Sequence, residues 1–150
     1  ELVKKYLGDN LDERKDYELF VNYWKKYLDM RFQKGKLIVN KLHQNLLYRM
    51  KFHYDNFVKD SKFTSTIGES GYGSVILAYD SLLDARNVWE KLVIYSMLHC
   101  GDSDTVGCIA GGWYGILYGI ENVPKKNLEY LEKKEELIVL GEKLYNKYFK

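Results

Sequence analysis

Glycine recurs every fourth residue in one apolar segment of this chain, at Gly107, Gly111, Gly115 and Gly119. A glycine inside a helix costs about 1 kcal/mol relative to alanine. A helix that repeats glycine in this way needs a compensating close approach of neighbouring backbones, which small residues permit. The spacing therefore predicts a buried helix that is pressed against its neighbours and whose first turn is held rigidly.

Two carboxylates and a hydroxyl stand directly before this segment. Asp102 and Asp104 lie two residues apart after Gly101, and Thr105 follows. Oxygen ligands of this kind suit Mg²⁺, which binds them at about 2.0–2.1 Å, and the positive end of the helix dipole favours their ionised state. Because Asp and Thr are also common helix N-caps, these residues alone leave both a metal site and simple capping open.

Three blocks of the sequence resemble one family, the ADP-ribosylglycohydrolases. Gly101-Asp102-Ser103-Asp104-Thr105, followed by Ile109-Ala110-Gly111, resembles the second metal-binding motif of that family. Gly68-Glu69-Ser70-Gly71-Tyr72, followed by Ala78–Leu83, is similar to the segment that contacts ADP-ribose and to its succeeding helix. Asn127–Tyr130 and the Lys/Glu/Leu-rich segment after it resemble the arginine-directed branch.

The resemblance implies a hydrolase that cleaves the N-glycosidic bond between ADP-ribose and protein arginine at a two-metal centre of Mg²⁺ or Mn²⁺. The implied metal ligands are Asp102, Asp104 and Thr105. The implied contacts with ADP-ribose are Gly68, Ser70, Gly71 and Tyr72, the last of which has a ring suited to stacking on adenine. The implied partner is ADP-ribose or an ADP-ribosylated protein.

The family also uses an N-terminal half that supplies a Thr-Asp-Asp motif and a further acidic residue, and nothing in this chain matches them. The chain begins at Glu1, so we expect either a single all-α domain over 1–150 or the C-terminal half of a larger domain. Catalytic residues are then expected in the N-terminal half, and the isolated chain is expected to be inactive. The alternative is a catalytically inactive relative or fragment that binds ADP-ribose or a protein. Locally, Cys100 and Val106 depart from the family pattern.

Apolar spacing predicts helix after helix and no convincing strand, which favours an all-α orthogonal array of helices. The first helix is expected over 17–31, and a second over 42–57 after a break at 33–36. A segment over 61–71 has no apolar periodicity, which indicates either a binding loop or a plain linker. Helices are then expected from Val75 and over 87–98, the latter with a capping box formed by Asn87 and Glu90. Pro124 separates the glycine-rich helix from one final helix.

Charge and composition exclude other function classes. The 23 Lys and Arg nearly balance the 21 Asp and Glu and are spread along the chain, which argues against nucleic-acid binding. The longest apolar run, Cys108–Ile120, has 13 residues, whereas a membrane span needs about 20. Two cysteines without metal or redox spacing predict free thiols in a reducing, cytoplasmic compartment. His99 either closes the helix before it or orients a carboxylate, and His43 and His53 receive no role.

Overall fold

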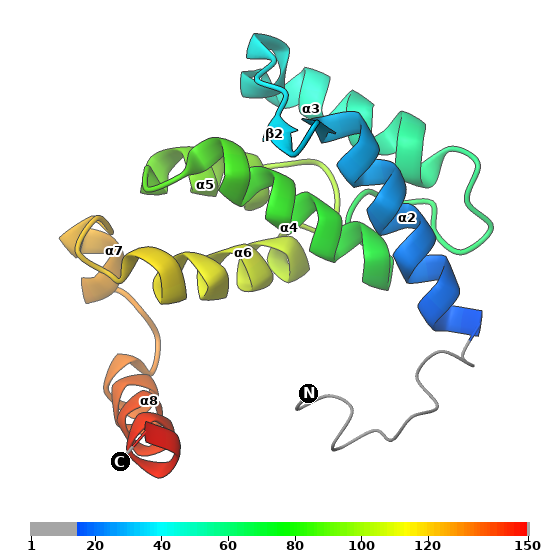
Figure 1. Cartoon of the computed structure of the whole chain (residues 1–150). Coiled ribbons are helices and arrows are strands. Elements are labelled where there is room, and N and C mark those ends of the chain that lie inside the picture. The colour runs from blue at the N-terminus through cyan, green and yellow to red at the C-terminus, as the bar shows by residue number, and fades with distance from the viewer. Residues whose placement is uncertain (1–14, 150) are drawn as a thin grey trace.

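Residues 15–149, which the computed structural model describes, form an array of helices with one short β-hairpin (Figure 1). The predicted all-α class is confirmed. In chain order the elements are α2 (Lys15–Arg31), β1 (Phe32–Gln33), β2 (Lys36–Leu37), a 3-10 turn (Lys41–Gln44), α3 (Leu46–His53), a π turn (Tyr54–Val58), α4 (Gly71–Ala85), α5 (Trp89–Ser96), α6 (Ser103–Tyr118), α7 (Lys125–Glu129) and α8 (Lys134–Phe149).

The break predicted over 33–36 is a tight hairpin. Phe32 pairs with Leu37 in antiparallel register, and the two residues at the tip, Lys34 and Gly35, have φ values of 50° and 72°. Positive φ at both central residues is the geometry that matches the twist of two paired strands. The hairpin reverses the chain so that the segment after α2 returns alongside it.

The single helix expected over 42–57 is wrong, because the segment is divided into a 3-10 turn, α3 and a π turn. Asn40 and Asn45 cause the first division. The Asn40 side chain accepts a hydrogen bond from the backbone N–H of Leu42, and the Asn45 side chain accepts one from the N–H of Tyr48 at 3.1 Å. Each asparagine thus starts a helical turn of its own, as short polar side chains do at N-caps.

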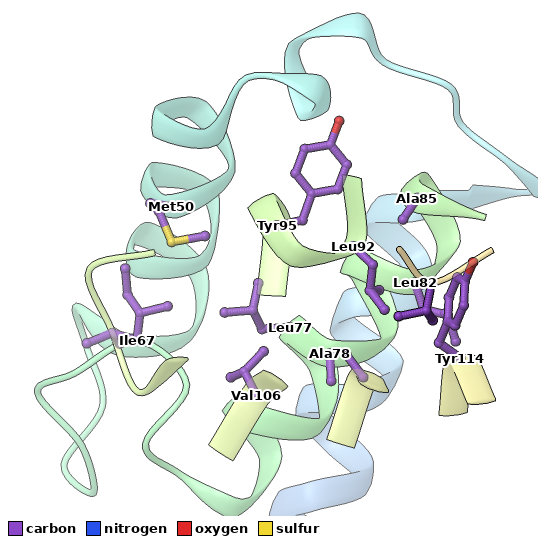
Figure 2. Close-up of a cluster of buried hydrophobic side chains, with 13 residues drawn as sticks. Met50, Ile67, Leu77, Ala78, Leu82, Ala85, Leu92, Tyr95, Val106 and Tyr114 are labelled. Carbon is purple, nitrogen blue, oxygen red and sulfur yellow. The ribbon is translucent and has the colours of Figure 1, made fainter. Parts of the chain in front are cut away.

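Helix α4 is the centre of the fold and packs against α2, α5 and α6. Leu77 and Ala78 of α4 are fully buried and lie against Leu92 of α5 and Val106 of α6 (Figure 2). Helix α5 starts with Val88 as its N-cap and has no side-chain cap. The capping box predicted for Asn87 is therefore wrong, since Asn87 precedes the cap and its carbonyl instead accepts a hydrogen bond from the Tyr114 hydroxyl.

The glycine stripe of α6 is buried at one end only. A Cβ on Gly107 would lie 2.8 Å from Cγ of Met97, whereas a Cβ on Gly115 would meet no atom within 4 Å. At about 3.6 residues per turn, a spacing of four drifts about 40° around the helix at each step. The stripe therefore winds away from the core, and the prediction that all of it is buried holds for Gly107 and is wrong for Gly115.

The chain after Pro124 forms two helices, α7 and α8, where a single helix was expected. Helix α8 contributes no buried residue and projects away from the other helices (Figure 1). No helix among residues 15–149 is both long and apolar enough to cross a membrane.

Candidate functional site

The structure brings together the two segments that the sequence analysis singled out. The backbone N–H of Asp102 donates a hydrogen bond to the carbonyl of Ile67 at 2.8 Å. Gly68 is buried beside this contact, and a Cβ on it would lie 3.8 Å from the Cβ of Asp102. The loop before α4 and the turn before α6 therefore form one junction, although Asp102 lies 34 positions after Gly68 in the sequence.

Glycine is required at both sides of this junction. A Cβ on Gly101 would collide with the carbonyl group of Ile67. Gly68 has a φ of +81°, and a Cβ there would lie 2.7 Å from Cγ2 of Val106. Glycine alone tolerates both the close backbone approach and the left-handed conformation without strain.

Two helix N-termini meet at this junction. Ser70 caps α4, and its hydroxyl accepts a hydrogen bond from the N–H of Gly73 at 3.0 Å. Asp102 caps α6, and its Oδ1 accepts one from the N–H of Thr105 at 3.3 Å. Because helix N-termini carry partial positive charge and unpaired N–H groups, their meeting point favours anionic groups.

The Asp102 and Asp104 carboxylates converge on one backbone group. Oδ1 of Asp104 accepts a hydrogen bond from the same Thr105 N–H at 3.0 Å. The pKa of Asp104 lies below its usual value because of its hydrogen-bond pairing with the Asp102 side chain and the hydrogen bonds that its carboxylate accepts from the backbone N–H groups of Thr105 and Asp104. Asp102 is half-buried, whereas Asp104 and Thr105 are exposed. The turn thus presents two neighbouring carboxylates at the surface, beside the Thr105 side chain.

The donor chemistry of this turn fits a hard divalent cation. Within residues 15–149, neither Asp102 nor Asp104 forms a salt bridge with a Lys or Arg. Their oxygens are the ligand type that Mg²⁺ prefers. Two carboxylates and one hydroxyl are fewer ligands than a closed octahedral shell requires, so such an ion would keep positions for water or for other groups.

The residues that were predicted to contact ADP-ribose have different structural roles. Gly71 is exposed and has open space where a Cβ would be, and the Ser70 hydroxyl serves as the α4 cap. The Tyr72 ring is 5% exposed and is stacked on Tyr23, with centroids 4.1 Å apart. Its hydroxyl is hydrogen-bonded to Ser61 at 2.8 Å. In this structure the Tyr72 ring is therefore not free to stack on a base, and it anchors the loop instead.

His99 shapes the turn. Its Nδ1 accepts a hydrogen bond from the backbone N–H of Gly101 at 3.1 Å. Burial lowers the pKa of His99, which favours the neutral ring that this acceptor role requires. The imidazole thereby fixes the backbone that leads into Asp102.

A buried cluster of charges on α2, α3 and α4 was not foreseen from the sequence. Arg31 and Arg49 each form ion pairs with both Asp80 and Asp84, including Arg31 Nη2 to Asp84 Oδ1 at 2.8 Å and Arg49 Nη2 to Asp84 Oδ2 at 2.6 Å. Oδ1 of Asp80 also accepts a hydrogen bond from the Tyr27 hydroxyl at 2.8 Å. The one feature of the sequence that pointed to this cluster was the spacing of Asp80 and Asp84 by one helical turn. The same spacing occurs on exposed helix faces, so it did not indicate burial.

Electrostatics in this cluster favour the charged form of Asp80. Burial by itself would raise the pKa of Asp80, but the Arg49 guanidinium, the His53 ring and Arg31 outweigh it and hold the pKa below its usual value. His53 is fully buried, and its Nε2 lies 3.2 Å from Oδ2 of Asp80. Burial lowers the pKa of His53. The cluster therefore holds a charged Asp80 carboxylate and two guanidiniums beside a neutral imidazole.

His43, Asp80 and Asp84 lie close enough together for their ligand atoms to surround a metal ion. Their environment does not suit one. All four carboxylate oxygens of the two aspartates already face a guanidinium nitrogen, so a cation would have to displace an arginine and would be repelled by both. Of the two acidic groups, only the turn at Asp102 and Asp104 is open to a cation.

The sequence model of the ADP-ribosylglycohydrolase family matches residues 8–150. This chain belongs to the ADP-ribosylglycohydrolase family. The match includes both sides of the junction, Gly68–Tyr72 and Asp102–Thr105. The resemblance of this chain to the family is thereby confirmed.

Several named proteins are similar to this family member. A protein of Acanthamoeba polyphaga mimivirus named as an ADP-ribosyl glycohydrolase, L444, is 36% identical over 132 residues, which are 88% of this chain and 24% of the relative. ADP-ribosylhydrolase ARH1 of Dictyostelium discoideum is 39% identical over 92 residues, or 61% of this chain and 24% of the relative. ADP-ribosylhydrolase ARH3 of Danio rerio is 36% identical over 69 residues, 46% of this chain and 19% of the relative.

The chain spans about a quarter of the length of the first two relatives. Most of the sequence of these ADP-ribosylglycohydrolases therefore has no counterpart in the matched stretch. No solved structure matches the chain.

Proposed function

We propose that this chain is the metal-binding part of an ADP-ribosylarginine hydrolase, which cleaves the N-glycosidic bond between ADP-ribose and protein arginine. The observation that carries the proposal is the junction of the loop before α4 with the turn before α6. It sets two neighbouring carboxylates, which no basic side chain of the described chain neutralises, beside two helix N-termini. The printed names of the relatives, ADP-ribosyl glycohydrolase and ADP-ribosylhydrolase, support the substrate class.

Asp102, Asp104 and Thr105 are assigned the role of holding Mg²⁺, or Mn²⁺, in one half of a two-metal centre. A bound ion of this kind can hold ribose hydroxyls and position a water molecule for attack on an oxocarbenium-like transition state. The chain itself fixes the geometry of the ligands: Gly101 and His99 set the turn, and the helix dipole favours ionised carboxylates.

The loop before α4 is assigned the contact with ADP-ribose. Gly71 leaves the backbone of the first turn of α4 accessible, and the N-terminus of a helix is a ready site for phosphate oxygens. Gly68 and Ser70 place this turn, and Tyr72 anchors it through Tyr23 and Ser61. The substrate is therefore expected to be recognised by backbone N–H groups rather than by stacking on Tyr72.

General acid and base groups are assigned to the larger part of the family sequence that lies outside the matched stretch. The 150 residues alone are accordingly expected to show no hydrolase activity, and activity is expected once a complementing N-terminal half is present. Cys100 and Cys108 are free and exposed, which favours a reducing, cytoplasmic location as part of the same proposal.

A second candidate is a catalytically inactive relative or fragment that binds ADP-ribose or a protein. The observation that favours it is the small ligand set of the turn, which closes no metal shell within the described residues. Binding of ADP-ribose is compatible with both candidates, and only the first predicts turnover in a complemented complex.

Titration calorimetry with ADP-ribose, with and without Mg²⁺, tests the proposal. We expect Mg²⁺ to strengthen ADP-ribose binding by the wild-type chain. Asp104→Asn should remove that enhancement, because it removes a charged ligand from an exposed turn. Asp55→Asn, which neutralises an exposed acid paired with Lys51 elsewhere on the surface, is the matched control. Identical titrations for wild type and Asp104→Asn would overturn the metal assignment.

A further inference from the structure

A groove without polar lining runs between three helices, away from the metal turn. Its volume is about 470 Å³. The lining residues come from α2, α4 and α6 and are Phe20, Trp24, Val75, Tyr79, Trp113 and Leu117, with Leu82 and Ile116 completing the set. Ile116 and Leu117 are 82% and 61% exposed. An exposed apolar groove of this kind marks a surface that another apolar group covers.

The outer face of α6 bordering this groove carries a line of small residues. Cys108, Gly112 and Gly115 follow one another at spacings of four and three, so they share a face of the helix. All three are exposed, and a Cβ on either glycine would meet no atom within 4 Å. Nothing in residues 15–149 therefore explains glycine at Gly112 and Gly115, although each helical glycine is costly.

Groove and glycine line together describe a surface for another helix. Aromatic and aliphatic side chains from three helices receive apolar side chains in the manner of a helix lying in a groove. The glycine line permits a second backbone to approach α6 closely. The missing polar lining argues against a small polar ligand such as ADP-ribose itself.

The length of the relatives indicates where such a helix comes from. The first two relatives extend over about four times the matched length, since the match covers 24% of each. We infer that the groove between α2, α4 and α6 receives an apolar-faced helix from the part of an ADP-ribosylglycohydrolase domain that lies outside this match. The inference rests on the proposed function and names the surface through which the complementing part joins the site.

The position of the groove gives this contact a functional consequence. Trp113 lies 11 residues after Asp102 along α6, which is about 16 Å at 1.5 Å per residue. A helix seated in the groove therefore lies within a few turns of the metal turn. Acidic residues carried by the same part of the domain can then complete the ligand set around Asp102 and Asp104.

Co-expression with the unmatched part of the mimivirus relative tests the inference. The 150-residue chain carries an affinity tag, and the untagged remainder of that relative is the probe. We expect the wild-type chain to retain the probe on the affinity resin. The double variant Ile116→Lys/Leu117→Lys should reduce retention at least tenfold, because it sets two charges in the groove. Leu47→Lys, at a position on α3 that is 80% exposed and outside the groove, should retain the probe like wild type.

Three outcomes would overturn the inference: no retention by the wild-type chain, retention that the groove variant does not change, and self-association of the chain alone that the groove variant abolishes. The last would make a second copy the occupant. If the probe is insoluble by itself, the wild-type chain should bring it into the soluble fraction and the groove variant should not.

Activity separates this inference from the proposed function. Retention through the groove without hydrolysis of ADP-ribosylarginine would leave the inference standing and refute the proposed function. Hydrolysis by the complex, lost in Asp104→Asn while retention persists, would support both.

Discussion

Two pairs of aspartates in this molecule carry the same chemical groups and have opposite roles. Asp80 and Asp84 lie one turn apart on α4, where the first is fully buried and both are bound by Arg31 and Arg49. Asp102 and Asp104 lie at the start of α6, and Asp104 faces solvent. Burial makes an internal counter-ion obligatory, whereas a solvated carboxylate keeps its lone pairs for a metal. Exposure thus decides which acidic pair is structural.

The largest change in the free energy of unfolding is expected when a charge is removed from the buried pair, Asp80 and Asp84. Asp80→Asn leaves two buried guanidiniums with only one carboxylate between them, and breaking a buried pair costs about 3–5 kcal/mol. Denaturant unfolding followed by far-UV circular dichroism measures this loss. A loss below about 1 kcal/mol would show that water reaches the cluster in solution and would contradict its description as a sealed ion-pair network.

As the pH falls, the free energy of unfolding is expected to decrease first through the buried cluster around Asp80, before the exposed turn at Asp102 and Asp104 is affected. Burial lowers the pKa of His43 to about 4 from 6.5, so between these values the unfolded chain binds the extra proton. The contribution of His43 is therefore complete above pH 6.5 and is lost as the pH falls toward 4, because the unfolded chain binds the proton more readily over that range. Asp80 acts in the same direction only at lower pH.

Unfolding free energies measured at intervals between pH 7 and pH 4 test this dependence. His43→Phe is the control, because it keeps a ring against Phe52 and Tyr48 and has no proton to bind. A slope that is unchanged in His43→Phe would assign the pH dependence to other groups, of which His53 is the first to examine.

The affinity for a divalent metal should change only when the exposed pair, Asp102 and Asp104, is substituted. Loss of one charged ligand in Asp104→Asn is expected to weaken Mn²⁺ binding about tenfold or more, since even residues behind the ligands change affinity by 10- to 100-fold. Electron paramagnetic resonance of free Mn²⁺ gives the dissociation constant directly. Asp84→Asn should leave that constant unchanged. A loss of Mn²⁺ binding in Asp84→Asn but not in Asp104→Asn would move the metal site to the His43 cluster.

The smallest effect on stability is expected at Asp102. Asn and Asp are about equally good N-caps, so Asp102→Asn should change the unfolding free energy by less than about 0.5 kcal/mol. The same substitution removes a charge from the metal turn and should weaken Mn²⁺ binding. Thermal unfolding compared with Asp80→Asn measures the contrast between the two pairs. Equal destabilisation by both substitutions would mean that the turn is as constrained as the core.

Local patterns were sufficient for several elements. The spacing of apolar residues placed α2 close to its observed bounds, and the residues around Asp102 placed the turn at the start of the glycine-rich helix α6. Those features depend on neighbours within one or two turns, which the sequence displays directly. The two asparagines that divide 41–58 were also visible, but their capping role depends on a backbone that departs from a continuous helix.

Local sequence patterns could not predict the contacts between segments that are distant in the sequence. Arg31, Arg49 and Asp80 come from three helices, and each alone resembles an exposed charge on an amphipathic helix. Which glycines of the stripe are buried likewise depends on how far α4 and α5 extend along α6, and this is known only from the structure. The burial of Tyr72 depends on its stack with Tyr23, 49 residues earlier in the chain.

The sequence by itself determined the helical class, the family and the turn at Asp102, because each is encoded in residues that are adjacent or share one helix face. The tertiary structure alone decided which acidic pair is buried, that the loop at Gly68 meets Asp102, and which part of α6 remains open. The physical reason is that solvation is a property of the packed molecule. A carboxylate binds an arginine or a metal according to whether other helices exclude water from it, and no local pattern records which helices those are.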